Sequence, residues 1–159
     1  MARYVARVHT PMAIAEAFAL VSDMRTFEDW DPGVRSVDQV VGDGPGLGAE
    51  YEVRVAASPV PAVPIDLTLH YVTERCEAPD SRNEPHTVLL VARSLLFSSV
   101  DLLTVSSAPG GCVVVYDADL RLNGPLRMGD LGLRVAFSWI GAHAEAGLRT
   151  ALDGTSVPA

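Results

Sequence analysis

The sequence contains no lysine, and all 12 of its basic residues are arginines, from Arg3 to Arg149. This absence excludes Schiff-base catalysis by a lysine and the lysine of a phosphate-binding loop. The 20 acidic residues outnumber the basic ones and give a formal net charge of −8. A surface of this charge repels nucleic-acid phosphates and anionic lipids. We therefore expect no nucleic-acid partner and no membrane insertion.

Cysteines and long apolar runs are also scarce. Cys76 and Cys112 are too few for a disulfide framework, and this low number is typical of a reducing compartment. Apolar runs such as Val88 to Ala92 are far shorter than the roughly 18 residues that span a bilayer. Charged residues interrupt the N-terminal segment, unlike the apolar stretch of a signal peptide. These features predict a cytoplasmic protein.

Sequence motifs for metals and common cofactors are missing. The four histidines show no metal-ligand spacing; they are His9, His70, His86 and His143. The glycines between Gly42 and Gly48 lack the dinucleotide fingerprint and precede a strand pattern instead of a helix. No Gly-x-Ser-x-Gly nucleophile motif occurs. We expect no metal and no cofactor.

The composition is that of one globular domain. The chain has 159 residues, of which 48% are apolar and only 6% aromatic, so valine, leucine and alanine supply most of the core. We expect a single domain over residues 1–153 and a frayed tail over residues 154–159.

The N-terminal region predicts a strand followed by two short helices. Tyr4 and its neighbours alternate between apolar and charged residues, as in a half-buried strand. Thr10 and the proline after it predict the N-terminus of the first helix. A second helix, capped by Asp23, ends at Trp30 because Asp31 precedes a proline.

The rest of the chain predicts an antiparallel sheet and a long final helix. Six further strands are expected, at residues 34–41, 47–57, 63–75, 86–94, 97–106 and 112–122. Short turn segments between them favour consecutive antiparallel pairing. Apolar residues at helical spacing follow from Leu126 to Leu152. The pattern predicts an α+β fold in which a curved seven-stranded sheet and this helix enclose a cavity.

Several stretches of the sequence resemble a known superfamily. They are Val8-His-Thr-Pro-Met-Ala-Ile-Ala-Glu-Ala-Phe, Val21-Ser-Asp, Trp30-Asp-Pro-Gly-Val, Gly46-Leu-Gly-Ala-Glu-Tyr, Gly110-Gly-Cys-Val-Val-Val-Tyr-Asp-Ala-Asp-Leu and Phe137-Ser-Trp-Ile-Gly-Ala-His-Ala-Glu-Ala-Gly-Leu. Together with the element order, they are similar to the helix-grip (START-like, SRPBCC) superfamily, in particular its bacterial polyketide cyclase/dehydrase group. The resemblance implies a hydrophobic ligand in a closed cavity. Members range from cyclases and hydratases to carriers, and no catalytic residue is common to all of them.

Candidate ligand-binding residues follow from the side-chain alternation of the strands. Counting by twos places Tyr51, Leu69, Tyr71 and Tyr116 on the inner face of the sheet. The final helix turns Phe137 toward the same face, and we expect Trp30 near the cavity mouth. The tyrosine hydroxyls suit a carbonyl or enolate oxygen. The alternative is that they are core residues whose hydroxyls are already hydrogen-bonded.

Arg93 and Asp101 are two charges in otherwise apolar strands that share a hairpin. If both side chains point inward, Arg93 binds a carboxylate or polarises a carbonyl, and Asp101 orients it or acts as a base. The alternative is a cross-strand ion pair on the sheet surface. Apolar residues on both sides of these positions leave their orientation open.

The final helix carries a second apolar stripe, with Trp139 at its centre. Such a stripe predicts a homodimer through the outer face of this helix. The alternative is a kink that turns Trp139 back against the loop at Trp30.

These features predict a protein that binds a hydrophobic or aromatic small molecule, with polyketide cyclase/aromatase chemistry as the sharper hypothesis. The alternative is a non-catalytic carrier or sensor of a lipid or polyketide-like ligand. The sequence alone does not choose between them.

Overall fold

The computed structural model describes residues 2–56, 66–81, 83–93, 97–123 and 143–158. Its elements follow in the order β1 (Ala2–Thr10), α1 (Ile14–Ser22), the 3-10 helix η1 (Met24–Thr26), α2 (Phe27–Trp30), β2 (Val34–Val41), β3 (Glu50–Ala56), β4 (Asp66–Glu77), β5 (His86–Arg93), β6 (Phe97–Ala108), β7 (Gly111–Leu122), a helix at residues 143–151 and β8 (Thr155–Ser156).

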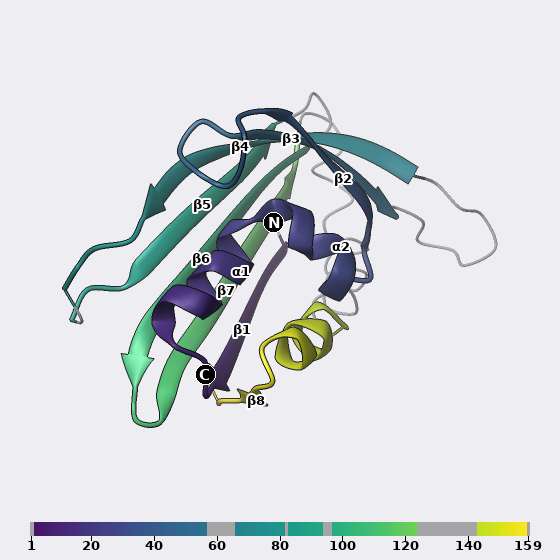
Figure 1. Ribbon diagram of the computed structural model, residues 1–159. Coiled ribbons are helices and arrows are strands. Elements are labelled where there is room, and N and C mark those ends of the chain that lie inside the picture. The colour runs from purple at the N-terminus through teal and green to yellow at the C-terminus, as the bar shows by residue number, and fades with distance from the viewer. Residues whose placement is uncertain (1, 57–65, 82, 94–96, 124–142, 159) are drawn as a thin grey trace.

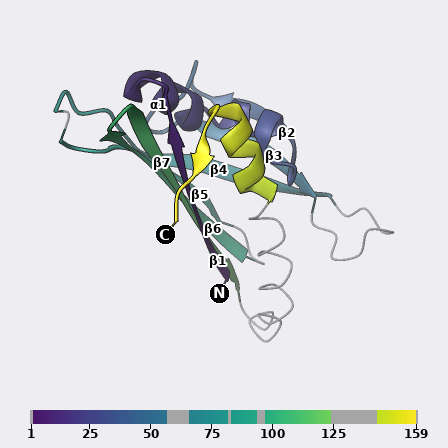
Figure 2. The same ribbon diagram turned by 90° about the horizontal axis from the view of Figure 1, so that it is seen from below.

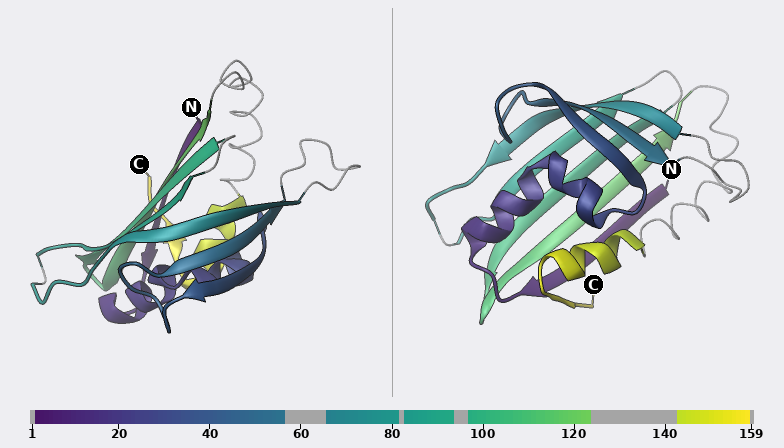
Figure 3. Two further views of the ribbon diagram at one scale, coloured as in Figure 1. Left: turned by 90° about the horizontal axis from the view of Figure 1, so that it is seen from above. Right: turned by 45° about the vertical axis from the view of Figure 1, so that its right-hand side comes forward.

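One curved antiparallel sheet contains all the described strands, in the order β2-β3-β4-β5-β6-β7-β1-β8. The described helices pack on its concave face, as Figures 1, 2 and 3 show from different sides. The α+β class is confirmed, but the expected number of seven strands is wrong. The eighth strand arises because the C-terminal end, expected to fray, pairs with β1 through Val8 opposite Ser156 and His9 opposite Thr155.

The first helix begins later than expected, at Ile14. Thr10 is the last residue of β1 and not a helix cap. Its hydroxyl accepts a hydrogen bond from the Met12 amide at 3.1 Å and donates one to the Leu152 carbonyl at 2.5 Å. Thr10 therefore ties the β1–α1 turn to the C-terminal end of the chain.

The second helix forms as expected, as η1 followed by α2. Asp23 accepts a hydrogen bond from the Arg25 amide and so caps η1. Asp31 adopts an extended conformation after Trp30, as expected for a residue before proline. Phe27 and Trp30 are buried against the sheet.

The long helix predicted from Leu126 to Leu152 is described only at residues 143–151. Ala144 and Leu148 face the core there, as the spacing predicts, while residues 124–142 lie outside the described part. A Cβ atom added at Gly147 would clash with the Trp30 carbonyl oxygen. The helix can therefore approach α2 this closely only with glycine at this position. No described helix is long and apolar enough to cross a membrane.

Strand alternation places the core on the concave side of the sheet. The inward positions predicted from the sequence for Tyr51, Leu69, Tyr71 and Tyr116 are confirmed, with each side chain at most 7% exposed. Helices α1 and α2 lie over the concave face of the sheet (Figure 3), and these side chains belong to one hydrophobic core with residues of both helices.

Candidate functional site

Asp101 is an acidic residue in the middle of this apolar inner face. It lies on β6 opposite Leu90 of β5 and Ala118 of β7, and it is only 4% exposed. A carboxylate is costly to bury unless nearby groups hydrogen-bond to it. The partners of Asp101 therefore determine its chemistry.

Three hydroxyl groups converge on the Asp101 carboxylate. The Tyr116 hydroxyl donates to Oδ1 at 3.2 Å, and Ser99 Oγ donates to Oδ2 at 3.3 Å. Tyr71, from β4, supplies a third side-chain hydrogen bond. Three strands thus contribute to one buried polar cluster, which we call the Asp101 cluster: Asp101, Tyr71, Tyr116 and Ser99.

Burial raises the pKa of Asp101 to about 6, although the hydrogen bonds from Tyr71, Tyr116 and Ser99 act to lower it. Burial and the Asp101 charge raise the pKa of both tyrosines well above its usual value, so their hydroxyls keep their protons. A carboxylate with a pKa this close to neutrality can both accept and return a proton. The Asp101 cluster thus combines a titratable base with two neutral hydrogen-bond donors.

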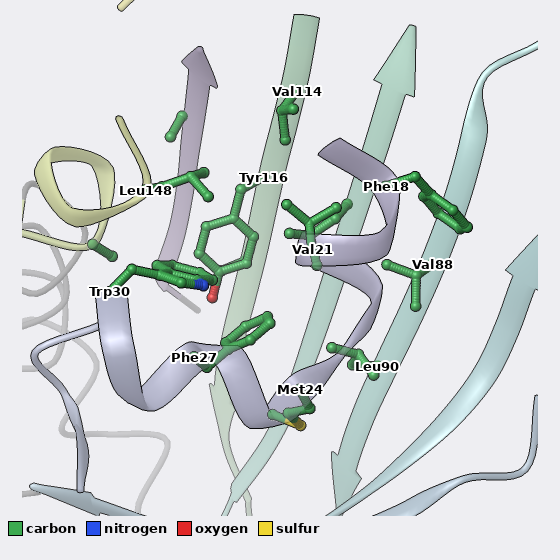
Figure 4. Close-up of a cluster of buried hydrophobic side chains, with 14 of the residues drawn as sticks. Phe18, Val21, Met24, Phe27, Trp30, Val88, Leu90, Val114, Tyr116 and Leu148 are labelled. Carbon is green, nitrogen blue, oxygen red and sulfur yellow. The ribbon is translucent and has the colours of Figure 1, made fainter. Parts of the chain in front are cut away.

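Aromatic rings from α2 pack against Tyr116 of this cluster (Figure 4). The Trp30 ring centroid lies 6.0 Å from that of Tyr116, and the Phe27 centroid lies 6.4 Å from it, both edge to face. Phe27 and Trp30 also contact each other, with centroids 4.4 Å apart. The surroundings of Tyr116 are therefore aromatic and apolar, which suits a flat apolar ligand.

Asp31 adds a second buried carboxylate on the helix side. It follows α2 directly, is 9% exposed, and its Oδ1 accepts a hydrogen bond from the Gly33 amide at 2.8 Å. Burial raises the pKa of Asp31, and its charge contributes to raising the pKa of Asp101. The charge on Asp31 therefore influences the protonation of Asp101.

A separate cavity of about 500 Å³ opens near the β5–β6 end of the sheet, lined by Asn83, Glu84, Pro85, Ser106 and Ser107. Ser106 is five residues along β6 from Asp101, or about 17 Å at the rise of a strand. The residues that line this cavity are almost all polar, whereas the surroundings of Asp101 are apolar. In the described part of the chain, no three His, Cys, Asp or Glu side chains gather as a metal site.

A match to a protein-family model shows which family this chain belongs to. Residues 1–152 match the family described as polyketide cyclase / dehydrase and lipid transport. The chain belongs to this family. The match covers every element from β1 to the helix at residues 143–151, so it includes all residues of the Asp101 cluster.

Solved structures share the fold of this polyketide cyclase/dehydrase family member at low sequence identity. The KanY protein is 19% identical with a TM-score of 0.64, covering 96% of this chain and 97% of its own. TTHA0849 from Thermus thermophilus is 13% identical with a TM-score of 0.60, covering 94% of this chain and 98% of its own. The di-domain ARO/CYC protein StfQ from the steffimycin biosynthetic pathway is 12% identical with a TM-score of 0.66, covering 95% of this chain and 49% of its own. A search of curated proteins finds no match.

Arg93 does not join Asp101. Its side chain is exposed, and its Nη1 donates to Glu74 Oε1 at 2.5 Å on the outer side of the sheet. Asp101 faces inward, so the two residues form neither a shared inner site nor the cross-strand ion pair considered as the alternative. The sequence does not reveal that Arg93 points outward, because the outer position before it, Val91, is apolar and almost as buried as its inward neighbours.

The other predicted residues fall into three groups. Tyr71 and Tyr116 reach Asp101, and Trp30 packs beside Tyr116. Tyr51 and Leu69 are buried on the same inner face. Among the described residues, Tyr51 makes no hydrogen bond to Asp101. Phe137 lies outside the described residues.

Sequence reasoning missed two members of the site, Asp31 and Ser99. Asp31 was interpreted only as the residue that ends a helix before proline. Ser99 is two residues from Asp101 on the same strand, so the alternation that places Asp101 inward also places Ser99 inward. That period of two was the signal that could have identified it.

Proposed function

We propose that this protein binds an apolar, ketone-bearing small molecule against the inner face of the sheet and transfers a proton on it, as a polyketide cyclase or dehydratase does. The observation that carries the proposal is Asp101, a buried carboxylate with a pKa raised to about 6 and two tyrosine hydroxyls on it. A purely structural core gains little from a titratable acid at this depth.

The proposed chemistry starts from ionised Asp101. The carboxylate takes a proton from the carbon next to a ligand carbonyl, so the C–H bond breaks and its electron pair moves onto the carbonyl oxygen as an enolate. Once Asp101 has taken the proton and lost its charge, the hydroxyls of Tyr71 and Tyr116, still protonated, turn from Asp101 and donate to that oxygen. Protonated Asp101 then returns the proton to the ligand, either to carbon or to a departing hydroxyl.

The comparisons support this proposal at the level of the family. The family description names cyclases and dehydrases, and StfQ is an ARO/CYC protein of a biosynthetic pathway. The same description also names lipid transport, which favours the second candidate, a carrier that binds its ligand without proton transfer. Proton exchange on a bound ketone separates these two functions.

The test uses β-tetralone, a small aromatic ketone with acidic hydrogens next to its carbonyl. In deuterated water, NMR follows the exchange of these hydrogens with and without protein. We expect the wild-type protein to accelerate exchange, with a rate that rises with pH through about 6 as Asp101 ionises. Asp101→Asn removes the base, so the protein-catalysed exchange rate should fall by a factor of about 100 or more.

Arg93→Ala is the matched control, because Arg93 is a charged residue of the same hairpin on the opposite face. It should leave the exchange rate unchanged. Saturable binding of β-tetralone without accelerated exchange would favour the carrier. Absence of binding in the folded wild-type protein would overturn the ligand-binding proposal itself.

A further inference from the structure

Two buried hydroxyls on the inner face have no hydrogen-bond partner among the described residues: Tyr51 Oη and Thr73 Oγ1. The Tyr51 side chain is fully buried and Thr73 is 1% exposed. Burying a hydroxyl without a partner costs stability, and most buried polar atoms in proteins are paired. Two such hydroxyls side by side are therefore a feature that needs an explanation.

The register of β3 and β4 brings these hydroxyls together. Tyr51 lies opposite Tyr71, and Thr73 follows Tyr71 by two residues, so all three side chains share the inner face. Burial raises the pKa of Tyr51, while the Thr73 hydroxyl lies close enough to lower it. The Thr73 hydroxyl acts on Tyr51 as a hydrogen-bonding neighbour, but neither hydroxyl makes a hydrogen bond of normal geometry, so both can turn to a third group.

The hydroxyl pair lies at a defined distance from the Asp101 cluster. Thr73 is the register partner of Leu90, and Leu90 is the partner of Asp101, so the three residues form one row across β4, β5 and β6. At the usual spacing of strands, Thr73 and Asp101 are about 10 Å apart at their backbones. Leu90, fully buried, separates the two polar points by an apolar surface.

We propose that Tyr51 and Thr73 form a second ligand subsite, which binds a carbonyl oxygen while another oxygen of the same ligand lies at Asp101. Two hydroxyl donors match the two lone pairs of a carbonyl oxygen. The ligand class is then a flat apolar molecule with oxygens on opposite sides. This inference rests on the proposed function, because it needs a ligand at Asp101.

Anthraquinone and anthracene form a matched pair of probes. The ring systems have the same shape, but anthraquinone carries two opposed carbonyl oxygens, about 5 Å apart. With a hydrogen bond of about 2.8 Å from a hydroxyl donor at each end, Thr73 or Tyr51 at one end and a tyrosine of the Asp101 cluster at the other, the two donors lie about 10 Å apart, which is comparable to the backbone separation of Thr73 and Asp101. The chain has two tryptophans, so Trp139→Phe leaves Trp30, beside Tyr116, as the fluorescent reporter of binding.

In this background, Tyr51→Phe and Thr73→Val each remove one hydroxyl. We expect each to weaken anthraquinone binding about fivefold to tenfold, as for one lost hydrogen bond, and to leave anthracene binding unchanged. Neither variant should lower the unfolding temperature, because each removes an unpaired buried hydroxyl. Thr68→Val, an exposed threonine on the outer face of the same strand, is the control and should change neither affinity.

Each outcome distinguishes the two proposals. If neither probe binds the wild-type protein, the proposed function fails and this subsite fails with it. If both probes bind with equal affinity, or if both variants keep the full preference for anthraquinone, the subsite is overturned while ligand binding stands. A loss of unfolding temperature in both variants would show that the hydroxyls are paired within the protein, and that result also overturns the subsite.

Discussion

Asp101 is the residue at which burial and hydrogen bonding oppose each other most strongly. Burial raises its pKa, and three hydroxyl donors lower it only part of the way back. A group whose pKa is higher in the folded than in the unfolded state stabilises the fold when protonated. The stabilising contribution of Asp101 is therefore complete below its ordinary pKa of 3.8 and is lost as the pH rises through about 6.

This sign gives a prediction for stability. Between about pH 4 and pH 7, Asp101 should lower the free energy of unfolding by about 3 kcal/mol, the equivalent of a shift of about two pKa units. The Asp101→Asn variant has no group to titrate at this position. Its free energy of unfolding should therefore rise relative to that of the wild type, by about 3 kcal/mol between about pH 4 and pH 7. Urea denaturation of both proteins at several pH values measures the difference. A difference that does not vary with pH would contradict a raised pKa at Asp101.

For individual residues, the sequence predicted that the tyrosine side chains point to the inner face, but it did not predict the orientation of Arg93 and Asp101. Tyr51, Tyr71 and Tyr116 lie in strands with clear alternation, whereas Arg93 ends a strand whose last residues are buried on both faces. The pairing of Arg93 with Glu74 also depends on an irregularity in the β4–β5 register between Thr73 and Arg75. A period-two count along one strand contains no information about such a bulge.

At the scale of elements, strands were predicted better than helix ends and the C-terminal segment. β2 spans Val34–Val41, as the alternation predicts, because its turns and apolar positions are local signals. The start of α1 was placed too early because Thr10 bonds to the distant Leu152 carbonyl instead of capping the helix. β8 was missed because a two-residue strand exists only through its pairing with β1.

The packing of the helix at residues 143–151 on α2 leads to a second prediction. Gly147→Ala places a methyl group against the Trp30 carbonyl oxygen, so the helix must move away from α2. We expect a loss of about 1–3 kcal/mol in the free energy of unfolding, the usual cost of overpacking. Thermal or urea denaturation measures it, with Ala146→Ser on the exposed face of the same helix as the control. Equal stability of Gly147→Ala and the wild type would show that the close approach is absent.

For the whole molecule, the order of elements predicted the architecture, and the family match agrees with it. A sheet with short links has one apolar face to cover, and α1, α2 and the helix at residues 143–151 cover it from the same side. The ligand remained beyond prediction because low-identity relatives share this fold, and function depends on individual residues within it.

Assembly is a third prediction, and it depends on Trp139, outside the described residues. The apolar stripe around Trp139 in the sequence predicts a homodimer. Light scattering on the wild type should give twice the mass of one chain, and Trp139→Glu should give a folded monomer. A monomeric wild type would remove the dimer and favour a role for Trp139 within its own chain.

The central claim is that a ligand binds against the inner face of the sheet at the Asp101 cluster. NMR of the protein with bound β-tetralone tests it most directly, through magnetisation transfer from ligand hydrogens to assigned side chains. The account predicts transfer to the rings of Tyr116 and Trp30, which pack together beside Asp101. Transfer confined to outer-face residues around Arg93, or no saturable transfer, would contradict it.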